Sequence, residues 1–480
     1  MKKLLYIFLT IGFAQTVFAQ TYSTGLAYDD VLNAKMPVRK LATNRGTLPA
    51  RVSLKEYCPT PQNQGQYPNC VGWAVGYAAC TISEAIIHEA LTDKKLTPKA
   101  IDAIATSPTF VYAHVKPKED KTCNSKACMD NVLTALKGNV IPRYQAFKDV
   151  CLPSNEAPKS FTAGARIENF TSLFQPSDSK KQKLYAIKQT LANKKPVVIG
   201  IWHYKSFEQA KKVWNGNLSK YAGSGHALCV TGYDDKFEGG AVEVMNSWGE
   251  EWGEAGFSMI RYRDLDTILK YAYEITLDGC QTFQKNVAPS LLHKKDTILN
   301  ATIELKLIPD SNRMPIALNP NKTPQPFESH FQTLKPYPSG TKYQAIMDHS
   351  EPVYLYVLSA DLTGHIEKLF PANATMSPFL SNPKAPFTLP NEEWYIETDE
   401  TVGKDYLIFL ASKTELSIDT LVDKWNTQSA PTPALEKIRQ SFSAKIQSFQ
   451  TINTLQNKIS FQAKLESEKI ILLTVEMEHQ

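Results

Sequence analysis

Residues 70–90 are the stretch that most restricts how this chain can fold. Apolar residues recur there at helical spacing, so the sequence predicts a helix that begins at Cys70. Small residues are frequent in the early part of the helix and let neighbouring elements pack closely against it. They are Gly72, Ala74, Gly76, Ala78 and Ala79. The pattern therefore predicts a buried central helix with Cys70 in its first turn.

Cys70 has competing interpretations. In an exported protein a cysteine is most often half of a disulfide or an inert core residue. A reactive cysteine needs a lowered thiol pKa, which a helix N-terminus and a nearby imidazolium both provide. The predicted helix meets the first condition for Cys70. A histidine held close to it would meet the second.

His226 has the most informative surroundings of the nine histidines. "HALCVTGY" alternates like a strand, "DDKFEGG" is typical of a turn, and "GAVEVMNSW" alternates again. If His226 faces Asn246 across this hairpin, the pair is centred on residue 236, and the turn 234–240 is centred on residue 237. The spacing therefore places the two side chains close together, where an Asn amide can fix the tautomer and orientation of the imidazole. Trp248 would shield that hydrogen bond from water.

Three blocks of the sequence, "QNQGQYPNCVGWA", "GHALCVTGY" and "NSWGEEWGEAGF", resemble the signature blocks of papain-family cysteine peptidases, in the family's order. The resemblance covers about residues 48–278. It implies that Cys70 is the nucleophile, His226 the general base and then acid, and Asn246 the residue that orients His226. Gln64, six residues before Cys70, would donate to the oxyanion together with the backbone N–H of Cys70. The implied fold is α+β and two-lobed, with a helical lobe and an antiparallel β lobe.

The chain departs from the family pattern in the predicted substrate groove. Tyr67 replaces a cysteine three positions before the nucleophile, so Cys123, which resembles the usual partner of that cysteine, must pair elsewhere or stay free. Ser125 and Lys126 replace a Gly-Gly pair, so the family's substrate preferences do not transfer. The valine after Cys70 is familiar in bacterial relatives.

The eight cysteines allow further disulfides. Cys123, Cys128 and Cys151 are expected to supply one local disulfide, with its connectivity open. Cys58 and Cys280 form a weaker candidate pair that would join the two ends of the peptidase domain. The sequence contains neither paired zinc-ligand spacing nor a phosphate-binding loop, so we expect no cofactor and no metal.

The first residues predict export. Two lysines, an apolar run and small residues before Gln20 are typical of a signal peptide that is removed after residue 19. Elsewhere no segment approaches the roughly 18 consecutive apolar residues of a membrane span, so we expect no integral membrane segment and a periplasmic or secreted protein. A net charge of +5 without blocks of like charge argues against nucleic-acid binding.

The predicted order of segments is a signal peptide (1–19), an N-terminal extension (20–47), a papain-like domain (48–279) and a C-terminal accessory domain (280–480). The extension is too short for the long inhibitory prosegment of many family members. The last region alternates strand-like runs with turns and has helix-like segments near 418–425 and 434–449, which predicts a mainly antiparallel β-sandwich with a helical insertion. The segment "YLYVLSADLTGHIEKLFP" resembles an uncharacterised bacterial accessory domain, which implies a role in contacting a surface or a protein partner.

The sequence thus predicts an exported cysteine peptidase, most simply an endopeptidase, that acts on proteins or peptides. Two alternatives remain open. In the first, the papain-like domain is catalytically silent and serves as a binding or scaffold module. In the second, an amine instead of water resolves the thioester, which makes the protein a transpeptidase.

Overall fold

The structure is a computed structural model of the 480-residue chain. It describes residues 22–39, 47–146, 151, 164–278, 297–318, 329–383, 386–391, 394–400, 402–428, 432–455, 457–466 and 468–480. The predicted signal peptide and Cys280 lie outside these residues.

The predicted central helix is confirmed and runs from Cys70 to Thr92. It starts as α2 (Cys70–Gly72), continues as a π-helix (η2, Trp73–Cys80) and ends as α3 (Thr81–Thr92). A Cβ atom at Gly72 would collide with the carbonyl of Pro108, at the start of α5 (Pro108–Val115), so only glycine allows this packing. The sequence analysis predicted one regular helix, and π-helical turns of this kind occur often at functional sites.

The same helix is the only one in the described part of the chain with the length and composition to cross a membrane. Of its most apolar window, 89% is buried inside the protein, as expected for a core helix.

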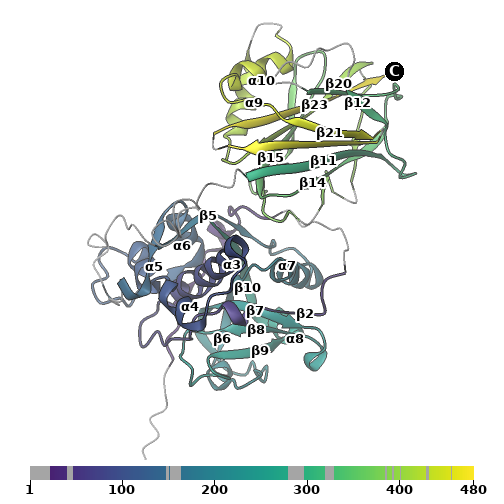
Figure 1. The fold of residues 1–480 in the computed structure, drawn as a ribbon. Coiled ribbons are helices and arrows are strands. Elements are labelled where there is room, and N and C mark those ends of the chain that lie inside the picture. Colours follow the sequence, from purple (N-terminus) through teal and green to yellow (C-terminus); the bar gives the residue numbers. More distant parts are fainter. Residues whose placement is uncertain are drawn as a thin grey trace, which may run out of the picture.

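Helices and a sheet pack around the central helix to form the first domain (Figure 1). The other α-helices of this domain in the described residues are α1 (Asp30–Asn33), α4 (Pro98–Ile104), α5, α6 (Met129–Leu136), α7 (Lys180–Ala192) and α8 (Tyr262–Ile268). The sheet has the order β3-β1-β7-β6-β10-β5-β4, and β2 and β8 also pair with β7, while β9 pairs with β8. Its strands are β1 (Leu26–Ala27), β2 (Arg51–Ser53), β3 (Ala127–Cys128), β4 (Val140–Pro142), β5 (Gly164–Ser172), β6 (Val197–Tyr204), β7 (Tyr221–Asp234), β8 (Ala241–Met245), β9 (Phe257–Arg261) and β10 (Leu269–Leu277).

The C-terminal region is a sandwich of two sheets, in agreement with the predicted fold class. One sheet has the order β18-β14-β11-β22-β21, and the other β12-β13-β23-β20-β15-β16. The short strands among these are β12 (Ile316–Leu318), β16 (Ile366–Phe370), β18 (Phe387–Leu389) and β21 (Gln450–Leu455). One apolar core lies between the sheets, and a second lies where α9 (Ile418–Thr427) and α10 (Ala434–Phe442) cover the second sheet. The longest strands are β11 (Thr297–Leu307), β14 (Lys342–His349), β15 (Val353–Ala360), β20 (Gly403–Ser412), β22 (Lys458–Leu465) and β23 (Ile470–His479). Most neighbouring strands are antiparallel, but β13 (Ser329–Thr333) runs parallel to β23.

The structure resolves the cysteine alternatives. Cys123 pairs with Cys151, with a Cα–Cα distance of 5.6 Å, so the predicted local disulfide is confirmed. The suggested pair of Cys58 with Cys280 is wrong, because Cys58 keeps a free thiol that donates to the carbonyl of Leu54.

Candidate active site

Cys70 is the first residue of α2, and its side chain is fully buried. The backbone N–H of Gly25 donates to its Sγ over 3.3 Å, and the N–H of Ala227, the residue after His226, also faces the sulfur. Burial raises the pKa of the Cys70 thiol to about 11, although these amides oppose the shift. In the form described here the sulfur is therefore a neutral thiol at pH 7.

The structure brings His226 and Asn246 together. Nε2 of His226 lies 2.8 Å from Oδ1 of Asn246, and the backbone N–H of Ser247 donates to the same Oδ1 over 2.8 Å. The predicted hairpin register is wrong by two residues, because β7 pairs Cys229 with Met245, whereas the predicted register would pair Cys229 with residue 243. Asn246 comes directly after the last residue of β8, and its side chain reaches His226 from there.

Trp248 covers the imidazole of His226, as the sequence suggested. The two rings are stacked with centroids 4.6 Å apart. Burial lowers the pKa of His226 to about 4, and the hydrogen bond to Asn246 opposes the shift. Nδ1 of His226 is buried and has no hydrogen-bond partner in the described part of the chain. One ring nitrogen is therefore fixed by Asn246, and the other is free to exchange a proton.

Gln64 is buried and held on both sides of its carboxamide. Nε2 donates to the carbonyl of Tyr67 over 2.8 Å, and Oε1 accepts from the hydroxyl of Ser247 over 2.5 Å. A carboxamide has two N–H donors, so one remains after the bond to Tyr67. The sequence analysis missed the role of Ser247, which joins the loop of Gln64 to the segment of Asn246. Its place in the "NSW" block was the available signal.

The N-terminal residues 22–39, which we call the strap, pass over the thiol. Strand β1 of the strap lies between β3 and β7 in the sheet, because Leu26 pairs with Ala127 of β3 on one side and with Gly225 of β7 on the other. A Cβ atom at Gly25 would lie 1.7 Å from the carbonyl oxygen of Pro68, so only glycine fits at this point. The strap therefore fills the space above Cys70.

Aromatic contacts hold both sides of this part of the strap. Tyr22 stacks on Trp248 with centroids 4.5 Å apart, and Nε1 of Trp248 donates to the carbonyl of Ser23 over 3.0 Å. Tyr28 packs against Trp202 at 4.5 Å and donates to the carbonyl of Ile201. Nothing in the sequence of this extension indicated a contact with the predicted nucleophile.

A second histidine, His203, lies behind His226. The ring centroids are 6.1 Å apart, and Nε2 of His203 lies 3.6 Å from Glu208. Burial, followed by the neighbouring charges of His226 and Lys205, lowers the pKa of His203 to about 3. Both imidazoles are therefore neutral in the folded protein at pH 7.

These two histidines predict a loss of stability in acid. The unfolded chain binds a proton at each imidazole below about pH 6.5, whereas folded His226 does so only near pH 4, so stability falls as the pH falls between these values. The contribution of His226 is about 3 kcal/mol. Chemical unfolding at pH 7 and pH 4.5 should show a smaller acid-induced loss for His226→Gln than for the unaltered protein. His365→Gln, at an exposed histidine, is the control and should lose as much stability in acid as the unaltered protein. If His226→Gln also loses as much stability as the unaltered protein, burial of a neutral His226 is not the cause of the acid sensitivity.

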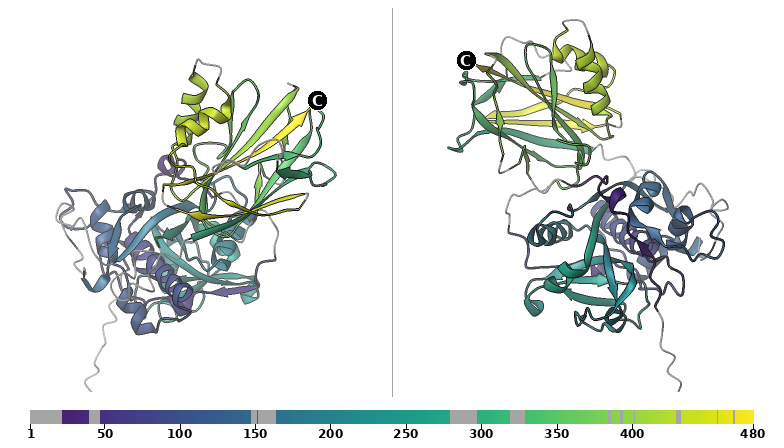
Figure 2. Two further views of the ribbon diagram at one scale, coloured as in Figure 1. Left: turned by 45° about the horizontal axis from the view of Figure 1, so that its top comes forward. Right: turned by 180° about the vertical axis from the view of Figure 1, so that it is seen from behind.

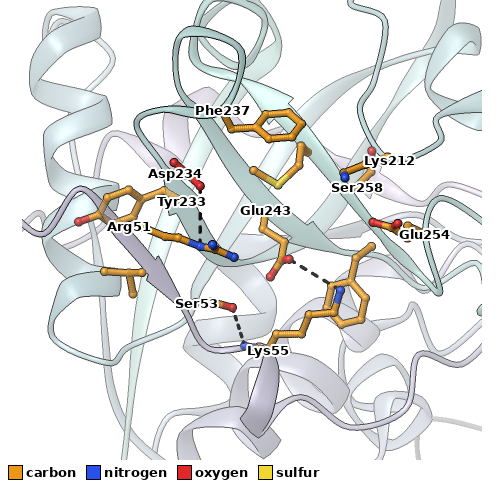
Figure 3. Close-up of a pocket in the computed structure, with 13 residues that line it drawn as sticks. Arg51, Ser53, Lys55, Lys212, Tyr233, Asp234, Phe237, Glu243, Glu254 and Ser258 are labelled. Carbon is orange, nitrogen blue, oxygen red and sulfur yellow. Dashed lines mark hydrogen bonds and ion pairs between the residues drawn. The ribbon is translucent and has the colours of Figure 1, made fainter.

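A pocket of about 410 Å³ lies apart from these residues, on the face formed by β2, β8 and β9 (Figure 3). None of the four predicted site residues lines it. Its walls carry three basic and three acidic side chains, and two of the pairs interact directly, Arg51 with Asp234 at 3.7 Å and Lys55 with Glu243 at 3.8 Å. This balance of charge gives the pocket no evident preference for a charged ligand.

Comparison with known proteins identifies two families in the chain. Residues 115–275 match the family described as "Papain family cysteine protease", and residues 336–415 match "Domain of unknown function (DUF4384)". The first match includes His226 and Asn246 but begins after Gln64 and Cys70.

Two relatives show the extent of the likeness. "Gamete and mating-type specific protein A" of Dictyostelium discoideum is 32% identical over 80 residues, which are 17% of each protein. "Cathepsin B-like CP2" of Giardia intestinalis is 23% identical over 263 residues, 52% of this chain and 85% of that protein. The chain thus spans less than a fifth of the first relative and most of the second.

Solved structures similar to this chain include two proteases. Xylellain, a cysteine protease from Xylella fastidiosa, matches 53% of this chain and 95% of its own, with 18% identity and a TM-score of 0.40. Digestive procathepsin L 3 of Tenebrio molitor matches 51% of this chain and 74% of its own, with 15% identity and a TM-score of 0.39. From the family matches, the chain carries a papain-family cysteine protease domain followed by a DUF4384 domain.

Proposed function

We propose that the protein is an exported cysteine endopeptidase with Cys70 as nucleophile, His226 as base and acid, and Asn246 as the residue that orients His226. His226 takes the proton of the Cys70 thiol, the resulting thiolate attacks a peptide carbonyl, and His226 gives that proton to the leaving amine. His226 then takes a proton from the water that hydrolyses the thioester and returns it to the sulfur of Cys70 as the carboxylic acid leaves. Gln64 and the backbone N–H of Cys70 stabilise the oxyanion.

One observation carries this proposal. His226 is fixed at Nε2 by Asn246 while Nδ1 is buried without a described partner, and the amide of the next residue, Ala227, faces the sulfur of Cys70. A nucleophile beside a base that is itself oriented by a third group is the arrangement that thiol acyl transfer requires.

The path of the strap supports cleavage within a polypeptide. The cleft holds an extended segment from Tyr22 to Tyr28 that passes the thiol and pairs with strands on both sides. A cleft that accepts chain on both sides of the nucleophile suits internal peptide bonds. The substrate class proposed is therefore proteins or peptides in extended conformation.

The strap also supports a latent form. Gly25 and Leu26 occupy the place where a substrate would have to lie, and burial under the strap keeps Cys70 protonated. We therefore assign the described form to the resting protein, in which the strap must leave before substrate binds.

Export stays part of the proposal. It is supported by the lysines, apolar run and small residues at the start of the sequence, and it places the protein in the periplasm or outside the cell. The Cys123–Cys151 disulfide suits such a compartment.

The test is the chemistry of the products. A variant with the strap displaced is incubated with a denatured protein, with and without an added amine, and the new termini are identified by mass spectrometry. New free carboxyl termini, absent with His226→Ala, are the expected result. Products that end mainly in the added amine would favour transpeptidation, and the absence of any cleavage would favour a binding role.

Gln64→Ala gives a test of the oxyanion donor. The loss of one such donor should lower kcat/KM by about 10²-fold, with kcat carrying most of the change. Gln62→Ala is the matched control, because its carboxamide donates to the nearby carbonyl of Thr60 and not to the loop before Cys70. Equal activities of the two variants would remove Gln64 from the mechanism.

A further inference from the structure

The far end of the strap is shared by the two domains. Strap residues 37–39 lie between the end of β5 in the first domain and residues 375–377 of the C-terminal domain. Figure 2 shows the purple N-terminal residues reaching the seam between the domains. The strap therefore contacts both the cleft and the C-terminal domain.

Backbone hydrogen bonds join the strap to each domain separately. Towards the first domain, the N–H of Arg39 donates to the carbonyl of Ser172, and the N–H of Ser172 donates to the carbonyl of Pro37, both over 2.8 Å. Towards the C-terminal domain, the N–H of Val38 donates to the carbonyl of Thr375 over 2.8 Å, and the N–H of Ser377 donates to the carbonyl of Val38 over 2.9 Å. Val38 is thus the strap residue whose backbone bonds go to the C-terminal domain.

A buried charge cluster lies beneath this seam. Nη1 of Arg39 lies 2.9 Å from Oε2 of Glu274, and the hydroxyl of Ser381, from the C-terminal domain, donates to the other oxygen of Glu274. Nζ of Lys195 donates to the carbonyl of Ser381 over 3.0 Å. Arg39 and Glu274 are both buried, so neither has water as an alternative partner.

Glu274 is ionised in this cluster. Burial opposes its charge, but Lys195 and Arg39, together with the hydroxyls of Ser381 and Thr171, outweigh the burial and hold the pKa of Glu274 below its usual value. The C-terminal domain therefore contributes directly, through Ser381, to the group that holds Arg39 of the strap.

The middle of the strap is fixed to the first domain between these two ends. In α1 (Asp30–Asn33), Asn33 donates to the hydroxyl of Tyr273 over 2.6 Å and to the buried Asp130 over 3.3 Å. Lys270 pairs with Asp30 at 2.8 Å. The strap is therefore held over Cys70 by contacts along its whole length, and the C-terminal domain contributes to the part of this anchorage at Val38 and Arg39.

We propose that the C-terminal domain holds the strap over Cys70, so that loosening the Val38 and Ser381 contacts opens the cleft. The inference rests on the proposed function only for its effect on peptide cleavage, because access to the thiol is measured without any substrate. Residues 375–381 are thus an interaction surface whose partner is the N-terminal segment of the same chain.

The test measures how fast iodoacetamide alkylates Cys70 in the full chain, with the modified residue identified by peptide mass spectrometry. Val38→Pro removes the donor to Thr375 and leaves the bonds of Arg39 and Ser172 in place. Ser381→Ala removes the hydroxyl bond to Glu274. Since one such bond contributes about 0.5–1.5 kcal/mol, each variant should be alkylated about 2- to 10-fold faster, and the double variant faster than either.

Glu415→Ala is the control. It removes another contact between the domains, the exposed pair with Lys137 at 2.9 Å, without touching the strap, and should leave the rate unchanged. Hydrogen exchange in residues 22–28 should rise in Val38→Pro and Ser381→Ala but not in Glu415→Ala. This second readout and the Ser381→Ala variant keep the test decisive if Val38→Pro fails to fold.

Alkylation and exchange at the unaltered rate in both folded variants would overturn the inference. A rise of the same size in Glu415→Ala would also overturn it, because the effect would then come from any loosening of the domains. Fast alkylation without peptide cleavage would instead count against the proposed function and leave the inference standing.

Discussion

Replacing Gly25 with valine is expected to let iodoacetamide reach Cys70 about 10²-fold faster at pH 7 than in the unaltered protein. A side chain at residue 25 has no room, because its Cβ would lie 1.7 Å from the carbonyl oxygen of Pro68. The strap must therefore leave the cleft. Water then reaches the thiol, and the burial that raises the pKa of Cys70 to about 11 is lost.

Two further measurements make this result specific. Thr24→Val, which loses only the hydroxyl contact with Ser224, should be alkylated at close to the unaltered rate. The pH at which alkylation of Cys70 is half-maximal should be lower in Gly25→Val than in the unaltered protein. If both variants are alkylated equally fast, the fit of Gly25 does not control access to the thiol.

Replacing Cys70 with alanine in the Gly25→Val protein is expected to lower the cleavage of a denatured protein by about 10⁴-fold or more. Without the Cys70 thiol the acyl intermediate of the proposed reaction does not form, so only the contributions of substrate binding and the oxyanion donors would remain. Cleavage is followed by electrophoresis and by mass spectrometry of the products.

Cys58→Ala in the same background is the matched control. Cys58 also carries a free thiol, but its sulfur donates to the carbonyl of Leu54 and has no contact with His226. The Cys58→Ala variant should cleave the denatured protein at the same rate as the Gly25→Val protein from which it is made. Residual cleavage of the same size in the Cys70 and Cys58 variants would exclude Cys70 as the nucleophile.

The central helix could be predicted because the residues that specify it all lie within the helix itself. Helical spacing from Cys70 and the small residues that follow it specify a buried helix without reference to any other part of the chain. The π-helical turns at Trp73–Cys80 could not be predicted, because the spacing of apolar residues there is the same as in an ordinary buried helix.

The hairpin shows both the strength and the limit of counting residues. Two alternating segments and a turn correctly brought His226 close to Asn246, but the register was wrong by two residues. The strands pair Gly232 with Glu243 beside the turn, so the hairpin is centred between residues 237 and 238 and not on residue 236. The ladder then shifts by one residue between Val230 and Gly232, and neither feature leaves a signal in the alternation.

The strap was not predicted because every contact that places it is distant in sequence. Strand β1 has only two residues, and its partners Ala127 and Gly225 are far along the chain. The same holds for Val38 and Thr375, which connect the extension to the second domain. Such pairings depend on the folded arrangement of both domains and not on local preference.

The most direct test of the account compares modification of Cys70 with loss of cleavage in the Gly25→Val protein. A thiol-directed epoxide is added in increasing amounts, and the modified fraction of Cys70 and the remaining activity are measured on the same samples. The account predicts that activity falls in proportion to Cys70 modification and that a peptide substrate slows both. Full activity with Cys70 completely modified would contradict it.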